Sequence, residues 1–317
     1  MRYIVAIWSL LAFCSFHQLG APALAEISKV IGTRVSMECP AGFKRAANFS
    51  GFNNEPLHAS IMVTEMPIPV EVATGGFNEA GLLSKGMKLL SKEIVQTAAY
   101  SDLLMEVRQT AYGSEFGKWL NVFGDKTTTV LVTASFPISE ADRLSKLLKE
   151  AVLSAHFEAT AKPLDPMEDL PFTVSGTTSL KIAGRLQNSL FLNASGNLPL
   201  PPDSTDVSLF VIGQALSDME VSDKTEFARQ RLKNTVNLID IQILEERDVT
   251  VAGLPAREIL ASAKSKSGQQ VFLLQTIAYG RGSYFVMQGT TEMSTRTRME
   301  YEFHSIINSL KLRSAAT

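Results

Sequence analysis

Cysteine and histidine are the residues of this sequence that could carry nucleophilic or metal chemistry, and both are scarce. The chain has two cysteines and four histidines. Outside the first 25 residues, the candidates are Cys39, His58, His156 and His304. A cysteine nucleophile needs an electropositive setting or an adjacent base, and a zinc site needs Cys or His ligands at short, regular spacings. Because the four residues show no such spacing, we predict no catalytic residue, no metal site and no cofactor.

Cys39 lies in the segment "SMECPAGFKRAANFSGF", residues 36–52. If the first 25 residues are removed on export, no second cysteine remains, so a disulfide within the chain is excluded, while a free thiol and an intermolecular bridge stay open. We interpret the segment as an opening hairpin in which Pro40-Ala41-Gly42 turn the chain. Phe43 and Phe49 are then expected to face the core, with Cys39 as an inert residue at the turn.

Motifs of other enzyme classes are also missing. The sequence has no G-x-S-x-G nucleophile elbow, no P-loop and no dinucleotide-binding glycine motif. Asp203 and Asp206 lack the glycine and the distal glutamate of a calcium-binding loop. We therefore expect a protein that is not an enzyme. The alternative is an exported hydrolase or small-ligand-binding protein, with a site between two domains that uses Cys39 or a histidine.

The amino terminus is typical of an export signal. Arg2 is followed by an apolar run over residues 3–16 and then by Ala23-Leu24-Ala25. The run is shorter than the ~20 apolar residues that a spanning helix needs, and A-x-A is a cleavage site for such signals. We predict cleavage near Ala25, a periplasmic or secreted protein, and no transmembrane span in the mature chain.

The charge balance bears on the kind of partner. The chain has 30 basic and 32 acidic side chains, and loss of residues 1–25 would remove only Arg2 from this count. Binding to nucleic acid without sequence preference requires a clustered basic surface. A mildly acidic chain does not provide one, so we expect no nucleic-acid partner.

The two halves of the sequence repeat the same order of expected elements. "NFSG" (Asn48 to Gly51) in the first half corresponds to "NASG" (Asn193 to Gly196) in the second. Further matched positions are Ser60–Val63 with Ser208–Val211, Phe77 and Leu82 with Phe227 and Leu232, and Val152-Leu153 with Ile306-Ile307. The proline-rich segment between the halves is typical of a linker. We predict a first domain over residues 26–157, a linker over 158–170 and a second domain over 171–313.

Local patterns predict an α+β fold, with two tandem domains that each contain a mainly antiparallel β-sheet sandwiched by helices. Ala80, Leu83, Met87 and Leu90 are spaced as on one face of a helix. Residues 130–136 and 270–289 are rich in β-branched and aromatic residues, with Gly280-Arg281-Gly282 as a hairpin turn. A capping box of Ser139 and Asp142 predicts the start of a helix that ends the first half. His156 and His304 are expected in the two closing helices, and Trp119 is expected in the core.

The first half resembles a known superfamily. "CPAGFKRA" leading into "SGF" and "ASIMVTEMP", a helix beginning "GFNEAGLLSKG", strands ending in "LVTASFP" and a closing amphipathic helix are similar to PsbP, the Ran-binding Mog proteins and the envelope protein DcrB. The resemblance covers roughly residues 30–157 and, without the Pro-Ala-Gly-Phe opening, roughly residues 172–312. It implies two tandem copies of a sheet sandwiched by helices. It also implies a docking or accessory role on a larger assembly.

The remaining candidates are residues for partner binding. The loop "NLPLPPD" offers Leu198, Leu200, Pro201 and Pro202 on a stiff, partly apolar connection. Lys264 and Lys266 are expected on a hairpin tip, with Arg281 on a neighbouring one, where together they could meet an anionic partner. We predict that the partner is another envelope protein, whose identity the sequence leaves unknown.

Overall fold

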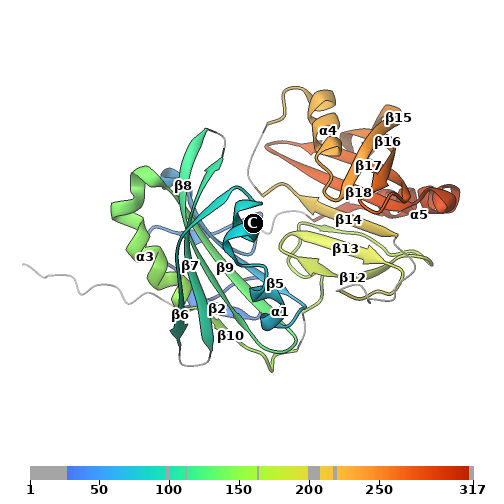
Figure 1. Cartoon of the computed structure of the whole chain (residues 1–317). Coiled ribbons are helices and arrows are strands. Elements are labelled where there is room, and N and C mark those ends of the chain that lie inside the picture. The colour runs from blue at the N-terminus through green and yellow to red at the C-terminus, as the bar shows by residue number, and fades with distance from the viewer. Residues whose placement is uncertain are drawn as a thin grey trace, which may run out of the picture.

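The computed structural model describes residues 27–97, 100–111, 113–162, 164–198, 208–216 and 220–313. The predicted signal segment and Leu200, Pro201 and Pro202 lie outside these residues. The described chain forms two large antiparallel sheets of seven strands each, with a few helices around them (Figure 1). The α+β class predicted from the sequence is confirmed at this level.

The first sheet has the spatial strand order β3-β4-β5-β9-β8-β7-β6. Its strands are β3 (Lys44–Arg45), β4 (Gly51–Asn54), β5 (Ala59–Met66), β6 (Met87–Gln96), β7 (Ser101–Ala111), β8 (Ser114–Gly124) and β9 (Thr129–Pro137). Buried and half-buried positions alternate along β9, so one side of this strand faces a core. The strand β6 is one edge of the sheet.

The second sheet has the order β12-β13-β14-β18-β17-β16-β15. Its strands are β12 (Lys181–Leu186), β13 (Ser189–Asn193), β14 (Leu209–Gln214), β15 (Leu238–Val251), β16 (Leu254–Ser265), β17 (Gln270–Gly280) and β18 (Ser283–Glu292). The order repeats that of the first sheet position by position, with β15 in the place of β6. Arg281 and Gly282 join β17 to β18 as the predicted hairpin turn, and Gly282 has the positive φ that this turn requires.

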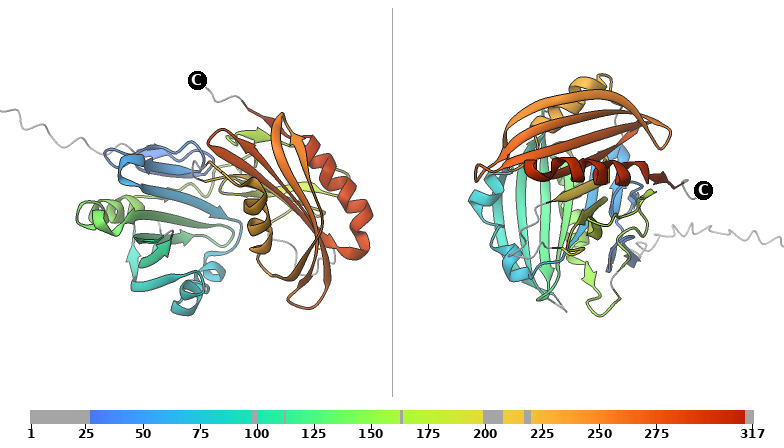
Figure 2. Two further views of the ribbon diagram at one scale, coloured as in Figure 1. Left: turned by 90° about the horizontal axis from the view of Figure 1, so that it is seen from above. Right: turned by 90° about the vertical axis from the view of Figure 1, so that its right-hand side faces the viewer.

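A helix closes each half on its outer side. The helices α3 (Ala141–Leu153) and α5 (Arg296–Asn308) lie at opposite ends of the molecule, and both views agree on this (Figures 1 and 2). Short strands tie each closing helix back to the start of its half: β1 (Ile27–Lys29), β2 (Val35–Glu38) and β10 (His156–Phe157) form one small sheet, and β11 (Phe172–Thr173) pairs with β19 (Lys311–Leu312).

Shorter helices cover the other face of each sheet. These are α1 (Val70–Thr74) and α2 (Glu79–Leu83) in the first half and α4 (Lys224–Lys233) in the second. Single-turn 3-10 helices η1 (Glu55–Leu57), η2 (Ile138–Glu140) and η3 (Met293–Thr295) connect other elements. Leu82 on α2 and Leu232 on α4 are both buried against the sheets. These two matched residues therefore take equivalent places.

Each sheet has a core on both faces. In the first half, Leu148 and Val152 of α3 pack with the larger core, which also contains Trp119, as predicted. In the second half, Phe303 and Ile306 of α5 pack with the corresponding core. The apolar faces of the helices thus hold them on the sheets, since burying such side chains contributes roughly 1.5–3 kcal/mol each.

The helix predicted through Ala80, Leu83, Met87 and Leu90 is wrong. The helix α2 ends at Leu83, and Met87 and Leu90 lie on β6. Gly86 adopts a φ of +70°, which interrupts a helix, and the chain then pairs with β7. The pairing with β7 overrides the helical spacing of the apolar residues.

Three smaller predictions also fail. "NFSG" precedes β4 whereas "NASG" follows from the end of β13, so the two tetrapeptides are not in equivalent places. Glu140 rather than Ser139 caps α3, without a side-chain hydrogen bond, because η2 precedes the helix directly. His156 lies on β10, after the closing helix has ended.

The described residues of segment 158–170 contain no helix or strand. The domain boundaries predicted around this segment stay a prediction. None of the helices in the described part of the chain is long and apolar enough to cross a membrane.

Candidate functional site

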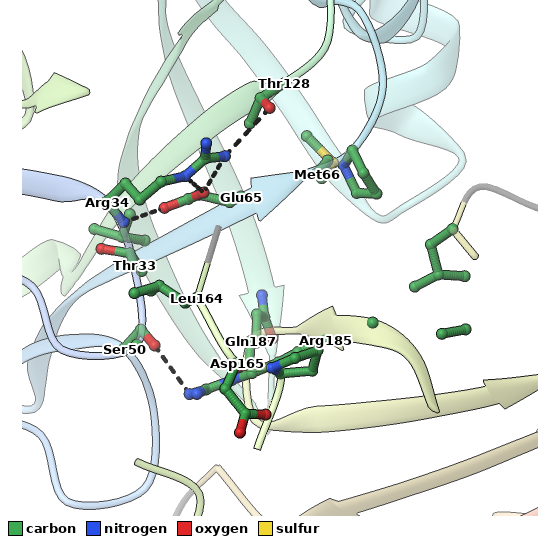
Figure 3. Close-up of a pocket in the computed structure, with 17 residues that line it drawn as sticks. Thr33, Arg34, Ser50, Glu65, Met66, Thr128, Leu164, Asp165, Arg185 and Gln187 are labelled. Carbon is green, nitrogen blue, oxygen red and sulfur yellow. Dashed lines mark hydrogen bonds and ion pairs between the residues drawn. The ribbon is translucent and has the colours of Figure 1, made fainter. Parts of the chain in front are cut away.

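A cleft lies where the two halves meet, and residues of both halves line it (Figure 3). Its volume is about 240 Å³. The first half contributes residues from the β1–β2 turn, from β5 and from the positions just before β4 and β9. The connecting segment contributes Leu164 and Asp165, and the second half contributes residues of β12, Gln187 and Leu198. Its lining includes Gly32, Arg34, Ser50, Glu65, Met66, Thr128, Leu164, Asp165, Ala183, Gly184, Arg185, Gln187 and Leu198.

An ion pair forms one wall of the cleft. The Nε and Nη2 atoms of Arg34 donate to the Oε2 atom of Glu65 at 3.0 and 2.9 Å. The backbone N–H of Arg34 donates to the other carboxylate oxygen, and Nη2 also donates to the Thr128 hydroxyl at 3.3 Å. The guanidinium lies 4.7 Å from the centre of the Phe157 ring. Arg34 and Glu65 thus neutralise each other and hold this wall in one conformation.

Arg185 forms the opposite wall and connects the two halves. Its Nη2 donates to the hydroxyl of Ser50 in the first half at 3.3 Å, and its Nη1 donates to the carbonyl of Glu168 at 2.6 Å. Its Nε donates to the carbonyl of Gln187. Burial lowers the pKa of the guanidinium, and the nearby Asp169 and Glu168 carboxylates oppose this shift.

A bulge and a glycine make room for Arg185. The pairing of β12 with β13 shifts register between Ile182 and Gly184, which leaves Ala183 as an extra residue on the strand that leads to Arg185. On the other side, a Cβ atom at Gly32 would lie 2.7 Å from Nη2 of Arg185. Gly32 also has a φ of +73°, which favours glycine. The guanidinium therefore fits because position 32 carries no side chain.

A second hydrogen bond crosses between the halves. The Gln187 Nε2 atom donates to the hydroxyl of Thr64 on β5 at 3.0 Å. Next to it, a Cβ atom at Gly184 would lie 3.0 Å from the Leu198 side chain. The floor of the cleft is thus fixed by contacts of side chains, while Met66, Leu164 and Leu198 give it apolar surface.

The structure separates the residues predicted to bind a partner. Leu198 lines the cleft. Lys264 is half-buried on β16 and pairs with Asp240 at 3.0 Å, while Lys266 is exposed in the β16–β17 turn. Arg281 is exposed in the β17–β18 turn, at the other end of β17. The expected cluster of Lys264, Lys266 and Arg281 is therefore wrong, because β17 separates the two turns, and a partner-binding role for each residue stays a prediction.

Cys39 is placed like a core residue. Its Sγ atom lies 3.6 Å from the carbonyl oxygen of Phe43 and packs against the core of the first half. Burial raises the pKa of the thiol, which disfavours the thiolate that a nucleophile needs. Phe43 is buried as predicted, whereas Phe49 is only half-buried.

The three histidines lie on different elements of the fold. His58 ends η1 and His156 is exposed on β10. His304 on α5 contacts Glu258, not a thiol. No group of three metal-binding side chains forms among the residues that the structure describes.

A buried polar cluster holds α5 on the second sheet. The Glu258 carboxylate is 2% exposed. It accepts hydrogen bonds from Arg247 at 2.9 and 2.6 Å and from the Thr276 hydroxyl at 3.1 Å. His304 Nε2 lies 3.1 Å from its second oxygen. This cluster joins three strands to the helix and contacts no cleft residue by a described bond.

The first half has a buried carboxylate that accepts hydrogen bonds from two neutral side chains. Asp102 is 1% exposed and accepts from Asn121 Nδ2 at 2.8 Å and from the Thr97 hydroxyl at 3.2 Å. Burial raises the pKa of this carboxyl, and its two hydrogen bonds oppose the shift. Asn121 also donates to the Val152 carbonyl of α3 at 2.9 Å, while its Oδ1 accepts no hydrogen bond from the described residues.

Comparison with known proteins gives limited matches. No family model matches the chain, and no curated protein matches it. The immunity protein TplEi from Pseudomonas aeruginosa is 12% identical with a TM-score of 0.34, over 90% of this chain and 97% of that one. LpqN of Mycobacterium tuberculosis, described as involved in cell envelope biogenesis, is 14% identical with a TM-score of 0.34, over 45% of this chain and 83% of its own.

The cyanobacterial PsbP of Synechocystis sp. PCC 6803 is 10% identical with a TM-score of 0.29, over 48% of this chain and 98% of its own. The resemblance to PsbP that the sequence predicts thus recurs only as a distant structural match. The Mog and DcrB resemblances and the tandem copies stay predictions. At these identities the matches assign no function to the chain.

Proposed function

We propose that this protein is an exported, non-enzymatic binding module of the cell envelope, and that the cleft between its two sheets holds a segment of a partner protein. The proposal includes two tandem PsbP-like domains joined by the segment 158–170. The common strand order of the two sheets supports this arrangement.

The observation that carries the proposal is that both halves build one cleft and fix it with their own side chains. The bonds of Arg185 to Ser50 and of Gln187 to Thr64 hold the walls before any ligand arrives. A preformed site loses less conformational entropy on binding, which favours affinity. A cleft that is already formed in the free protein is therefore suited to binding a segment of a partner protein.

The size of the cleft favours a protein segment over a separate small molecule. Pockets for drug-sized ligands have volumes of about 300–1,000 Å³, and this one has about 240 Å³. One or two side chains of a protruding loop fill such a volume, while the rest of the partner lies outside. Binding energy then comes from the rim as well as from the cleft.

The lining defines the chemistry of that segment. Met66, Leu164 and Leu198 offer apolar contact. Arg34 is neutralised by Glu65, and Arg185 directs three of its donors to protein acceptors. The Asp165 carboxylate accepts from the backbone N–H of Met167 at 2.9 Å. The inserted side chain is therefore apolar, and polar groups of the partner backbone meet the rim.

Filling the cleft tests the proposal. Ala183→Trp places a large side chain on the half-buried bulge of β12, inside the cleft, and Ala41→Trp places the same side chain at an exposed position outside the cleft. Crosslinking capture from the native envelope should recover one partner with the wild type and with A41W, and lose it with A183W. Unfolding curves of both variants would confirm that they fold. Capture by A183W at the level of the wild type would overturn the proposal.

A further inference from the structure

The strands β6 and β15 occupy the same place in the two sheets and share an unusual surface. Each is the last strand of its sheet, and no other strand of the described chain pairs with its outer side. β6 has 10 residues and β15 has 14. A free strand edge presents unpaired backbone N–H and C=O groups that can template pairing with another chain.

Both edges also expose large apolar side chains. On β6, Ile94 is 63% exposed and Leu90 is exposed as well. On β15, Ile239 is 49% exposed, with Ile243 and Leu244 also exposed. Folded proteins usually protect such edges with charges, prolines or a covering loop. Both edges carry charged residues as well, but these apolar side chains remain in solvent in the single molecule.

The two edges differ in charge. β6 carries Lys88 and Lys92 and is preceded by Lys85, and its one acidic residue, Glu93, pairs with Lys149 of α3 at 2.9 Å. β15 carries one basic residue, Arg247, and four acidic residues: Asp240, Glu245, Glu246 and Asp248. These acidic residues pair with Lys264, Arg247, Arg229 and Arg257 of the same molecule, so the contrast between the edges lies in the charge of the strands themselves. Like charges directly opposite each other destabilise a strand pair. Pairing of β6 with β6, or of β15 with β15, is therefore disfavoured relative to pairing of β6 with β15.

We propose that the β6 edge of one molecule pairs with the β15 edge of a second copy of this chain. Figure 1 shows the two strands on the far sides of the two halves, so one molecule cannot pair its own edges. Pairing of β6 with β15 leaves a free β15 edge at one end of the dimer and a free β6 edge at the other. Further molecules can add at both ends, so the association continues into open chains of molecules. This inference uses surfaces outside the cleft and does not depend on the proposed function.

The contact between the two edges can extend only over the stretches of β6 and β15 that are free of bulges. The pairing of β6 with β7 shifts register between Leu89 and Ser91 and is then continuous to Gln96. The pairing of β15 with β16 shifts twice and is continuous from Glu245 to Val251. Bulges at an edge blunt its pairing. The new ladder is therefore short, and the association is weak and dependent on protein concentration.

Charge reversal tests the pairing without any assumption about its register. In sedimentation velocity, the wild type should show a weight-average mass that rises with concentration and falls with added salt. Lys88→Glu with Lys92→Glu should abolish this rise, whereas Lys162→Glu, an exposed lysine of the connecting segment, should not. Adding a Glu245→Lys, Asp248→Lys variant to the K88E/K92E variant should restore association. A wild type that stays monomeric at every concentration would overturn the proposal, and so would a mixture that does not associate.

Chemical crosslinking tests which edges meet. In a Cys39→Ala background, Ile94→Cys and Ile243→Cys each place one thiol on one edge, and a flexible bis-maleimide reagent tolerates several registers. The mixture of the two variants should form crosslinked dimers at least tenfold more than either variant alone. Crosslinking of a single variant with itself at the level of the mixture would contradict pairing between unlike edges. Absence of crosslinking in the mixture would do the same.

Discussion

Arg185 on β12 donates a 3.3 Å hydrogen bond to the hydroxyl of Ser50. Ser50 lies 135 positions earlier in the sequence. The same guanidinium donates to the carbonyl of Glu168, in the segment that connects the halves. One side chain therefore contacts both halves and their connection.

Gly32→Ala should disturb the cleft through Arg185. Gly32→Ala brings a Cβ atom to 2.7 Å from Nη2 of Arg185, at a φ of +73°, whereas Gly86→Ala meets a φ of +70° with no atom within 4 Å. The backbone cost of a positive φ, about 1–2 kcal/mol, is common to both variants. We expect Gly32→Ala to lower the free energy of unfolding by a further ~1 kcal/mol, because the Arg185 guanidinium must shift and weaken one of its hydrogen bonds. Chemical denaturation of both variants measures this difference, and equal losses would contradict the fit described here.

Arg185→Ala should loosen the contact between the halves. The variant leaves the carbonyls of Glu168 and Gln187 without their donor, and we expect a loss of about 1–3 kcal/mol. Arg231→Ala removes an exposed arginine of α4 and serves as the control. Thermal unfolding of R185A should separate into two steps while R231A keeps the profile of the wild type. A profile of R185A that matches R231A would show that Arg185 does not couple the halves.

The Glu258–His304 contact should make stability depend on pH. The hydrogen bond from Glu258 raises the pKa of His304, against the opposing effect of burial, and the charge of Glu258 adds to the rise while Arg247 opposes it. Burial pushes the pKa of the Glu258 carboxyl up, but the bonds and charges of His304 and Arg247 bring it below its ordinary value. The contribution of His304 is thus fully present below the ordinary histidine value of about 6.5 and is lost as pH rises through its raised pKa. The contribution of Glu258 is present above the ordinary glutamate value of about 4.3 and is lost as pH falls through its lowered pKa.

His304→Gln measures this dependence. Relative to the wild type, the variant should lose more stability at about pH 5.5 than at about pH 8.5, because only the protonated imidazole gains from the Glu258 charge. His156→Gln changes an exposed histidine of the first half and serves as the control. Denaturation midpoints at the two pH values are the readout. An equal loss of stability at the two pH values would mean that the positive charge of His304 does not contribute to stability.

Asp102→Asn should stabilise the protein at neutral pH. Burial raises the pKa of the Asp102 carboxyl, so its ionised form costs stability once pH exceeds the ordinary aspartate value, and this cost is complete only above the raised pKa. Asn keeps the shape and can still accept from Asn121 while removing the charge. The melting temperature of D102N should exceed that of the wild type at about pH 7 and match it at about pH 3. Asp142→Asn, at an exposed position of α3, should not raise the melting temperature at either pH.

Local sequence patterns predict the central strand β9 correctly, but they predict a helix where the edge strand β6 lies. Residues 130–136 and the Gly280–Gly282 turn form as predicted, because β-branched residues and glycines determine conformation over a few neighbours. The apolar residues around β6 fit a helical spacing, and only Gly86 in a positive φ and the pairing with β7 decide against it. Neither feature is visible in the spacing itself.

No local pattern in the sequence predicts the cleft. Arg34 and Glu65 are 31 positions apart, and Arg185 and Ser50 are 135 apart. No motif connects them, and each is an ordinary polar residue in its own segment. Leu198 was predicted from the stiffness of its loop, and the structure places it in the cleft for a different reason, its contact with Gly184.

Photo-crosslinking from inside the cleft tests the central claim most directly. A photoreactive amino acid at Met66, which lines the cleft, is compared with the same amino acid at Tyr301, which is exposed on the outer helix α5. Irradiated in the native envelope, the Met66 variant should yield one defined crosslinked product with a protein other than this chain, and the Tyr301 variant should not yield it. The absence of any product from Met66, or the same product at equal yield from Tyr301, would contradict a partner-binding cleft.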